Sequence, residues 1–368
     1  MRFLERERAT TAKLLPGLDE SLRAVPLMEM EGPDAPGIEL FRDSGGPGLV
    51  VPSVSQGLGA TALDALRVQR ALGSRSPSLA VATTSHHFAM ALMAGLVTDQ
   101  GLEWMLVEGV AAGNRLAATD LAEERPDAGI LSASTTATEG PDGVRISGAT
   151  RAGALARSMD LLVVGATIAR SDGSGDELAV ALVPAETEGV NVGGTDATRE
   201  QVTLDDALVP PELVVRASDL GGQLDARLGA AFAWFQVLIT GSCLGAADAL
   251  VERVLLDGRV PESERVRLVA EVEGAMSAAE GIARRIDDGD ADASTPAHSL
   301  YVRYCVQDTL SRVVPRAVEL LGNLDSAASA EVAHLTTCAT GLALHPPTRA
   351  RTTGPLAAYL TDGRLPLT

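Results

Sequence analysis

The sequence contains few aromatic residues and almost no lysine. Phe, Trp and Tyr make up 3% of the 368 residues, and Lys13 is the single lysine. A surface that stacks bases or sugars is therefore not expected, because stacking needs aromatic side chains. The net charge of −19 argues against nucleic-acid and anionic-membrane partners, since both require a basic face. An anionic cofactor or coenzyme A would need a local cluster of arginines.

Cysteines are also scarce, and an N-terminal targeting signal is not evident. Cys243, Cys305 and Cys338 are odd in number and lie in apolar helical sequence, so we expect small core residues rather than disulfides or metal ligands. The segment Met1–Lys13 is highly charged, unlike a secretory signal. The uncharged run Leu228–Ala247 is long enough for a membrane span, but its polar residues favour a buried central helix. A soluble, cytoplasmic protein is expected.

The remaining sequence is rich in apolar residues and changes its periodicity twice. It is 46% hydrophobic, which is enough for a large core. Apolar residues spaced by three and four predict helices in residues 1–115, and short β-branched runs between Asp/Gly turns predict a small antiparallel β domain at 116–220. Helical spacing returns in residues 221–368, which predicts a four-helix bundle with helices at 223–256, 263–287, 297–321 and 329–343. The predicted fold class is α+β and mainly helical.

Five local patterns occur in a characteristic order along the chain. They are the glycine-rich turn Gly57–Ala60, the helix Gln100–Gly113, the segment Ala117–Asp120, the hairpin Gly143–Gly148 and the strand Val202–Pro210. This order resembles the acyl-CoA dehydrogenase superfamily, and the match covers nearly the whole chain. The resemblance implies a helical N-domain, a β-barrel-like middle domain and a C-terminal four-helix bundle, assembled as a homodimer or homotetramer through the bundle.

The resemblance also implies a chemistry and a cofactor. In the superfamily, a Glu carboxylate removes the α-proton of an acyl thioester while a hydride passes to FAD. The thioester is carried by coenzyme A or by an acyl carrier protein. Thr119 falls in the first flavin loop, and Arg259 is the residue shared with the turn that supports the dinucleotide end. These two residues are the predicted cofactor contacts.

Several positions depart from the superfamily pattern. Ala152 and Ala154 stand where an aromatic residue and a hydroxyl residue contact the flavin. Glu319 replaces a Gln near the pyrophosphate, where like charges repel. The sequence has no Glu after Glu331, and Ala226 occupies the alternative position of the catalytic base, although a one-residue slip would offer Asp225 instead. Weak FAD binding or none is therefore expected, without dehydrogenation by the standard Glu.

Other titratable residues are candidates for replacing the missing base. His86 and His87 fall on the helix that lines the acyl pocket in the superfamily, and a neutral-pKa imidazole could act as acid or base. The alternative for this pair is hydrogen bonding to nearby backbone. His345 lies near the usual base segment, and Asp120 follows the first flavin strand. The alternatives are a turn residue for His345 and a solvated loop for Asp120.

Two further residues are candidates for binding the substrate. Arg227 matches a superfamily position and could hold a phosphate or the pantetheine arm, although a surface salt bridge is equally consistent with the sequence. Phe235 belongs to an aromatic cluster that could line an acyl pocket or simply pack in the core.

Three functions are compatible with these residues. The leading hypothesis is a diverged enzyme that acts on an acyl thioester without ordinary FAD-dependent dehydrogenation. The second is a working FAD-dependent acyl-CoA dehydrogenase whose base lies elsewhere. The third is a non-catalytic subunit that completes a hetero-oligomer. Bound flavin in the purified protein would favour the second.

Overall fold

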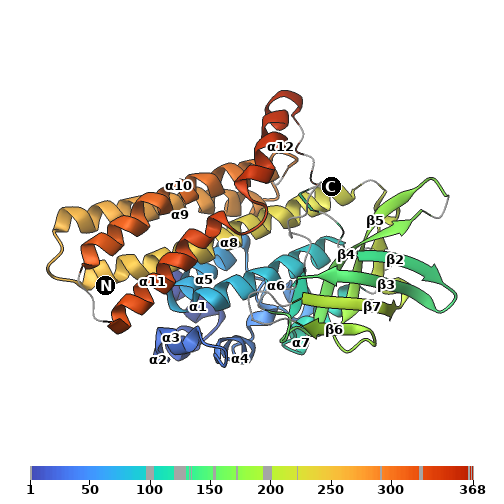
Figure 1. The fold of residues 1–368 in the computed structure, drawn as a ribbon, viewed down its shortest axis with the longest axis horizontal. Helices are drawn as coiled ribbons and strands as arrows, with labels where there is room; N and C mark the ends of the chain where they lie inside the picture. Colours follow the sequence, from blue (N-terminus) through green and yellow to red (C-terminus); the bar gives the residue numbers. More distant parts are fainter. Residues whose placement is uncertain are drawn as a thin grey trace. The chain divides into compact units, whose positions relative to one another are not determined.

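The computed structural model of the chain combines helices with one mixed sheet (Figure 1). The residues that the structure describes are 2–96, 103–119, 130–131, 133, 135–151, 155–170, 173–193, 201–221, 223–290, 292–322, 326–363, 365 and 367. The helices before the sheet are α1 (Glu5–Leu14), α2 (Leu18–Ala24), α3 (Leu27–Met30), α4 (Gly37–Asp43), α5 (Ala62–Arg75), α6 (Pro77–Leu96) and α7 (Glu103–Ala112).

The strands and the later helices follow in chain order. The strands are β1 (Ala117–Thr119), β2 (Thr135–Gly140), β3 (Gly143–Thr150), β4 (Leu161–Ala169), β5 (Asp176–Pro184), β6 (Val190–Gly193), β7 (Gln201–Val209) and β8 (Val214–Arg216). The helices after them are α8 (Leu224–Leu256), α9 (Glu262–Asp287), α10 (Thr295–Leu321), α11 (Ser326–Thr340) and α12 (Arg349–Asp362). The predicted bounds of α8 to α11 agree with these to within three residues. The predicted α+β, mainly helical fold class is confirmed.

The chain divides into two compact units, each assembled from separate segments. The first unit comprises Met1–Gly46, Ala60–Thr84 and Ala233–His345. The second unit comprises Pro47–Gly59, Ser85–Phe232 and Pro346–Thr368. Among the described residues, the first unit is helical and the second contains every strand.

Glycine allows two helices of the first unit to approach closely. A Cβ atom at Gly73 of α5 would overlap the carbonyl oxygen of Ser242 in α8. In the same way, a Cβ atom at Gly245 of α8 would overlap the carbonyl oxygen of Arg70. The absence of side chains at these two positions brings the two backbones into direct contact.

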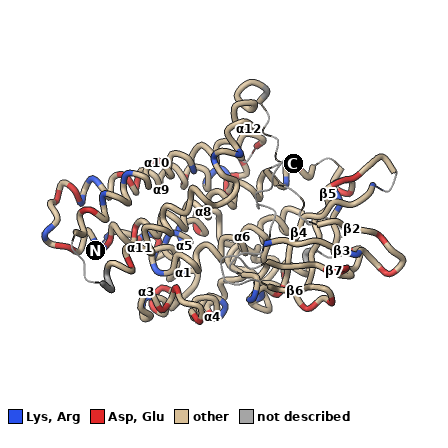
Figure 2. The backbone as a smooth tube through the Cα atoms, viewed as in Figure 1, with Lys and Arg blue, Asp and Glu red and all other residues tan. Residues whose placement is uncertain are grey.

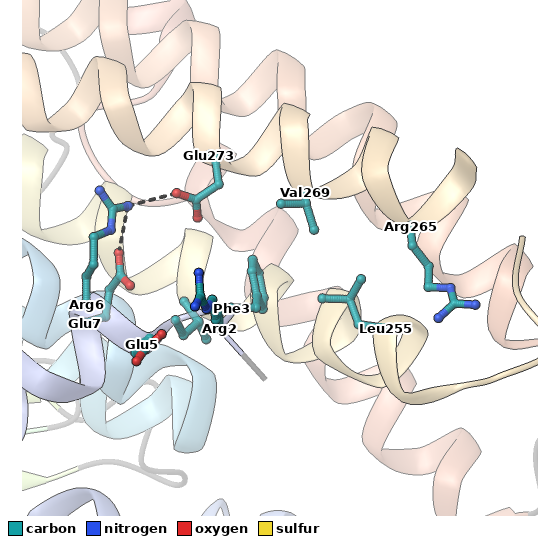
Figure 3. Close-up of a pocket in the computed structure, with 10 residues that line it drawn as sticks. Arg2, Phe3, Glu5, Arg6, Glu7, Leu255, Arg265, Val269 and Glu273 are labelled. Carbon is teal, nitrogen blue, oxygen red and sulfur yellow. Dashed lines mark hydrogen bonds and ion pairs between the residues drawn. The ribbon is translucent and has the colours of Figure 1, made fainter. Parts of the chain in front are cut away.

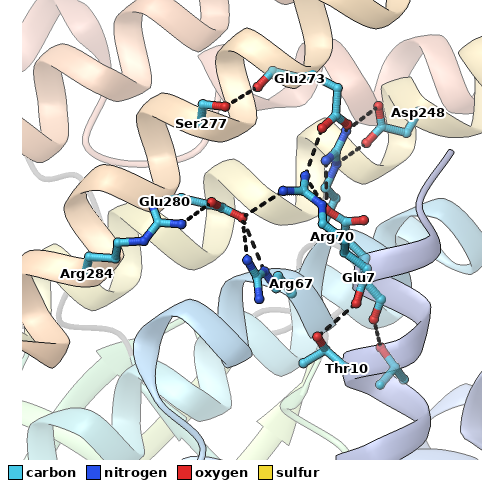
Figure 4. A network of polar contacts seen from close by, with 11 residues as sticks. Glu7, Thr10, Arg67, Arg70, Asp248, Glu273, Ser277, Glu280 and Arg284 are labelled. Carbon is cyan, nitrogen blue, oxygen red and sulfur yellow. Dashed lines mark hydrogen bonds and ion pairs between the residues drawn. The ribbon is translucent and has the colours of Figure 1, made fainter. Parts of the chain in front are cut away.

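A buried network of ion pairs crosses the same region of the first unit (Figure 4). Arg70 is fully buried, and its Nε lies 2.6 Å from Asp248 Oδ2. Its Nη1 lies 2.9 Å from Glu7 Oε1, and its Nη2 lies 2.8 Å from Glu273 Oε1. Burial raises the pKa of Asp248 to about 6, although Arg70 acts in the opposite direction. The carboxylate is therefore ionised at neutral pH, and the network joins α1, α5, α8 and α9 through opposite charges.

The sheet of the second unit has the strand order β6-β7-β3-β2-β4-β5-β8, and β1 also pairs with β4. Five of its pairings are antiparallel, as predicted. The pairings of β1 and of β2 with β4 are parallel, so the prediction of a purely antiparallel domain is wrong for these strands. Strands β4 and β5 are buried along almost their whole length, whereas buried and exposed residues largely alternate in β7. The continuous apolar runs at β4 and β5 therefore mark the centre of this unit.

Two helices are long and apolar enough to cross a membrane by composition alone. They are α6 and α8, and 72% and 89% of their apolar windows are buried inside the protein. Figure 2 shows charged residues along α9 and α10 and in the strand loops, while α6 carries none. This burial is typical of core helices, and the prediction of a buried helix at Leu228–Ala247 is confirmed.

Candidate functional site

The ring of His86 joins three segments of the second unit. Its Nδ1 accepts a hydrogen bond from the amide of Ala117 at 3.0 Å. The hydrogen therefore resides on Nε2, which donates to the carbonyl oxygen of Pro47 at 2.9 Å. This geometry fixes the tautomer of His86 and uses both ring nitrogens to hold α6 against the start of β1. It corresponds to the alternative anticipated for the pair, hydrogen bonding to backbone.

His87 is in a different electrostatic situation on the same helix. Its side chain is fully buried, and its ring centroid lies 5.2 Å from that of His86 at an interplanar angle of 56°. Burial, followed by the proximity of His86, lowers the pKa of His87 well below its ordinary value. His87 is therefore a neutral imidazole at physiological pH. Such a ring can donate one hydrogen bond and accept another.

Thr119 ends the short strand that leads into the first flavin loop of the sequence motif. It pairs with Val163 in the parallel register between β1 and β4, and its side chain is buried. The neighbouring candidate Asp120 lies outside the described residues. The same holds for Ala152 and Ala154, where an aromatic and a hydroxyl residue were missing from the motif.

Arg227 is bound within the second unit by polar contacts to neighbouring helical segments. Its Nη1 donates to the carbonyl oxygen of Gly95 at 2.6 Å, and its Nη2 donates to Gln223 Oε1 at 3.3 Å. Gly95 belongs to the last turn of α6, where carbonyl groups lack helical partners. A cation at this position also interacts favourably with the helix dipole. These contacts give Arg227 a structural role at the end of α6.

Arg259 and Phe235 belong to the first unit. Arg259 is exposed and contacts its neighbour Asp257, with 2.6 Å between Nη2 and Oδ2. Hydrogen bonds from Arg259 lower the pKa of Asp257 to about 2. Phe235 is buried in α8 with the rest of the core.

A second buried arginine lies beside His345 in the first unit. Arg303 of α10 is fully buried and donates to Gln236 Oε1 at 2.7 Å and to the carbonyl oxygen of Leu342 at 2.8 Å. It also donates to the carbonyl oxygen of His345. Burial lowers the pKa of Arg303 to about 10. Burial and the nearby guanidinium together lower the pKa of the His345 side chain to about 4, so this imidazole is neutral at pH 7.

Sequence reasoning missed Arg303, although the chain carries a signal for it. Leu300, Arg303 and Leu310 follow each other at spacings of three and seven, which places them on one face of α10. An arginine on an apolar stripe is rarely buried without polar partners. Its partners, among them the carbonyl of Leu342, could not be inferred because they lie far along the chain.

The cysteines differ from the prediction in one respect. All three are free thiols in the structure, and Cys243 is a buried core residue, as predicted. Cys305 is exposed, so the expectation of a core residue is wrong there, because its position faces away from the apolar stripe of α10. Cys338 is half-buried and lies close to a histidine.

An open cavity of about 460 Å³ lies near the N-terminus in the first unit (Figure 3). Phe3, Leu255 and Val269 supply apolar surface, and charged side chains surround them. Arg6 contacts Glu273 there, with 2.8 Å between Nη2 and Oε2. The described residues that line this cavity include none of the predicted site residues.

Comparisons with known proteins agree with the resemblance. No protein-family model matches the sequence. Isobutylamine N-hydroxylase of Streptomyces viridifaciens is 38% identical over 380 residues, which span 99% of this chain and 100% of that protein.

Solved structures share the fold at low sequence identity. Dibenzothiophene monooxygenase (TdsC) from Paenibacillus sp. A11-2 is similar with a TM-score of 0.75 and 17% identity, covering 100% of this chain and 99% of that chain. KijD3 in complex with FMN and a dTDP-amino sugar has a TM-score of 0.77 and 19% identity, with coverages of 97% and 94%. Glutaryl-coenzyme A dehydrogenase has a TM-score of 0.76 and 18% identity, with coverages of 100% and 96%.

The chain belongs to the acyl-CoA dehydrogenase superfamily. The resemblance drawn from the sequence motifs is confirmed, and the chain is an enzyme of this superfamily. The proteins similar to it include monooxygenases and an N-hydroxylase as well as a dehydrogenase. Membership alone therefore does not imply an acyl thioester substrate, which stays a prediction.

Proposed function

We propose that this enzyme hydroxylates the nitrogen of a small primary aliphatic amine, using dioxygen and a reduced flavin. The observation that carries the proposal is the 38% identity with isobutylamine N-hydroxylase over essentially the full length of both chains. The fold similarity to TdsC and to KijD3 with FMN is consistent with flavin-dependent oxygenation.

The proposed reaction balances without a catalytic carboxylate. One amine, one dioxygen molecule and one reduced flavin give an N-hydroxylamine, water and oxidised flavin. The nitrogen exchanges one hydrogen for a hydroxyl group, the O–O bond breaks, and the second oxygen atom leaves as water. When bound, a reduced flavin would supply the two electrons and activate dioxygen. A separate reductase that consumes NADH or NADPH would regenerate it.

The altered base motifs of the sequence support oxygenation over thioester dehydrogenation. Removal of an α-proton requires a positioned base, whereas attack by nitrogen requires only its own lone pair. Ala226 stands at one base position of the superfamily. The last glutamate of the chain, Glu331, is in an ion pair with Arg253, with 2.6 Å between Oε2 and Nη2. Glu331 is therefore engaged in this ion pair, and the proposed chemistry needs no carboxylate base.

Among the described residues, Thr119 of the second unit and Arg259 of the first occupy superfamily flavin positions. Thr119 is buried at the end of β1, where the superfamily's flavin loop begins, and it keeps the residue type of the superfamily. Its side chain would contact the flavin ring. At the positions that correspond to the dinucleotide end, Arg259 forms an ion pair with Asp257. Glu319 forms another with Arg316, with 2.6 Å between Oε2 and Nη1. A pyrophosphate would have to displace these local ion pairs. We therefore expect the flavin to exchange with solution.

In this proposal, His87 favours the uncharged form of the substrate. Alkylammonium ions have a pKa near that of lysine, about 10.4, and only the free amine has a lone pair to react. Burial keeps His87 itself neutral, and the same loss of solvation would penalise an ammonium ion nearby. A neutral imidazole at this position adds no charge of its own to its surroundings.

The proposal is tested by supplying the purified full chain with a flavin reductase, FAD or FMN, NADH and isobutylamine. We expect an N-hydroxylamine by mass spectrometry, formed only when flavin, reductase and dioxygen are all present. A parallel reaction contains acyl-CoA thioesters and an electron acceptor in place of the amine. Desaturation of a thioester, with no hydroxylated amine from a panel of small amines, would refute the proposal.

A further inference from the structure

Three side chains with metal-binding atoms, one of them the half-buried Cys338, converge in the first unit. His334 and Cys338 lie four residues apart on α11, so they share one face of that helix. Glu31 follows α3 and points its Oε2 at His334 Nε2 across 2.8 Å. Cys338 Sγ lies 3.4 Å from the same nitrogen, and the three ligand atoms are all within 4.8 Å of one another.

The geometry does not suit a nucleophilic cysteine. A relay from a thiol through histidine to a carboxylate uses both ring nitrogens, one for each partner. Here Cys338 and Glu31 both contact Nε2 of His334. Burial, followed by the charge of Glu31, raises the pKa of the Cys338 thiol to about 12, which suppresses the reactive thiolate.

A cation bound between the three atoms would satisfy all of them, whereas a single proton on the histidine ring can satisfy only one neighbour. Nε2 of His334 carries at most one hydrogen, yet it faces both the carboxylate oxygen of Glu31 and the sulfur of Cys338. In a tetrahedral zinc site, ligand atoms lie about 3.3–3.6 Å apart, as follows from metal bonds of about 2.0–2.3 Å. The sulfur–nitrogen distance of 3.4 Å already has this value. The oxygen–nitrogen distance would lengthen by a few tenths of an ångström.

The surroundings orient the carboxylate and leave a route to the site. The side chain of Glu31 is 1% exposed, and that of His334 is 25% exposed. Glu31 Oε1 accepts a hydrogen bond from Ser76 Oγ at 2.6 Å, and Oε2 accepts one from Ser78 N at 3.1 Å. Partners of this kind fix the ligands of metal sites in proteins.

We propose that Glu31, His334 and Cys338 bind a divalent zinc-like cation, with a fourth position for water. Thiolate, imidazole and carboxylate together favour zinc over magnesium or calcium, which prefer oxygen ligands. Binding releases the thiol proton of Cys338, after which the two anionic ligands balance the charge of the cation. The site ties α11 to the segment after α3, and it is independent of the proposed hydroxylation.

Cobalt(II) is the probe for the first test. The full chain is treated with chelator and titrated with cobalt, whose bond to a thiolate gives a charge-transfer band in the near ultraviolet. We expect one equivalent to bind, and added zinc to abolish the band. Cys338→Ser should lose the band and Glu31→Gln should weaken binding at least about tenfold. Cys305→Ser is the matched control and should keep it.

A second measurement uses the unaltered protein, so it does not depend on a variant folding. Iodoacetamide labelling is followed by mass spectrometry, with and without zinc. We expect zinc to protect Cys338 and to leave labelling of the exposed Cys305 unchanged. Absence of a cobalt–thiolate band in the wild type, an equal band in Cys338→Ser, or labelling of Cys338 that zinc does not slow would each overturn the proposal.

Discussion

Arg70 and His87 are both buried, but Arg70 stays charged whereas His87 is neutral. Arg70 keeps its charge because Glu7, Asp248 and Glu273 surround it. His87 is equally buried, and loses its charge because burial lowers its pKa. The comparison shows that this chain uses carboxylates to hold helices together and keeps the imidazole at its proposed site neutral. A neutral site suits an amine substrate better than an anionic one.

The charged region should be the more costly to disrupt. Arg70→Leu leaves Asp248 buried without its bidentate partner, and we expect the free energy of unfolding to fall by about 3–5 kcal/mol. Urea-induced unfolding followed by circular dichroism measures the change. The control is Arg267→Ala, which removes an exposed arginine that contacts Glu271 at 3.4 Å and is 60% exposed. Its cost should stay below about 0.5 kcal/mol; similar costs for both variants would refute the contrast.

The proposed neutral site predicts a strong pH dependence of amine hydroxylation. If only the free amine reacts, kcat/KM should rise about tenfold per pH unit up to the pKa of the amine, about 10. Between pH 7 and pH 9 the rise is therefore about a hundredfold. A fluorinated amine of lower pKa is the control, since its profile should level off at correspondingly lower pH. A flat profile for the unsubstituted amine would argue against selection of the neutral form.

Acid stability tests the neutral state of His87 directly. Its pKa is lowered in the folded protein, so below about pH 6.5 the unfolded chain binds a proton that the folded chain does not. The free energy of unfolding should therefore fall as the pH falls, by up to about 1.4 kcal/mol per pH unit from this residue. His87→Gln should make that slope shallower. The half-buried His298 provides the control variant, His298→Gln, and an unchanged slope in His87→Gln would contradict a neutral buried imidazole.

The smallest expected effect concerns Arg227. Because its guanidinium holds the carbonyl oxygen of Gly95 at the end of α6, Arg227→Gln should lower the free energy of unfolding by about 0.5–1 kcal/mol. The KM for an amine should change little, since an amine offers no anionic group to this residue. If Arg227→Gln instead raised the KM for an acyl-CoA more than tenfold, the result would support the prediction that Arg227 binds a phosphate of the substrate.

The fold could be predicted because its signals are local. The apolar spacing of α8, α9 and α10 gave their bounds nearly correctly, and the strand runs stood out between Asp/Gly turns. The parallel pairing of β2 with β4 could not be predicted, because Ala137 and Ile168 meet only through the tertiary fold. The hydrogen bonds of His86 to Pro47 and Ala117 could not be predicted from the sequence either, because they join residues that are far apart along the chain.

The candidate site was harder to predict than the fold. Individual residues such as His87 could be selected by chemical type, yet their neutral or charged state depends on burial that a single sequence does not specify. The cluster of Glu31 with His334 spans 303 positions of the chain, and only folding brings it together. The altered flavin and base motifs were visible in the sequence, but an amine in place of a thioester was suggested only by a homologous enzyme.

The most direct test of the central claim is an isotope experiment. The full chain is supplied with reductase, flavin and isobutylamine under oxygen-18 gas, and the product is analysed by mass spectrometry. Our account predicts an N-hydroxylamine that carries one oxygen-18 atom, with the second atom in water. An N-hydroxylamine without the label, or no amine product alongside a desaturated acyl thioester in the parallel reaction, would contradict it.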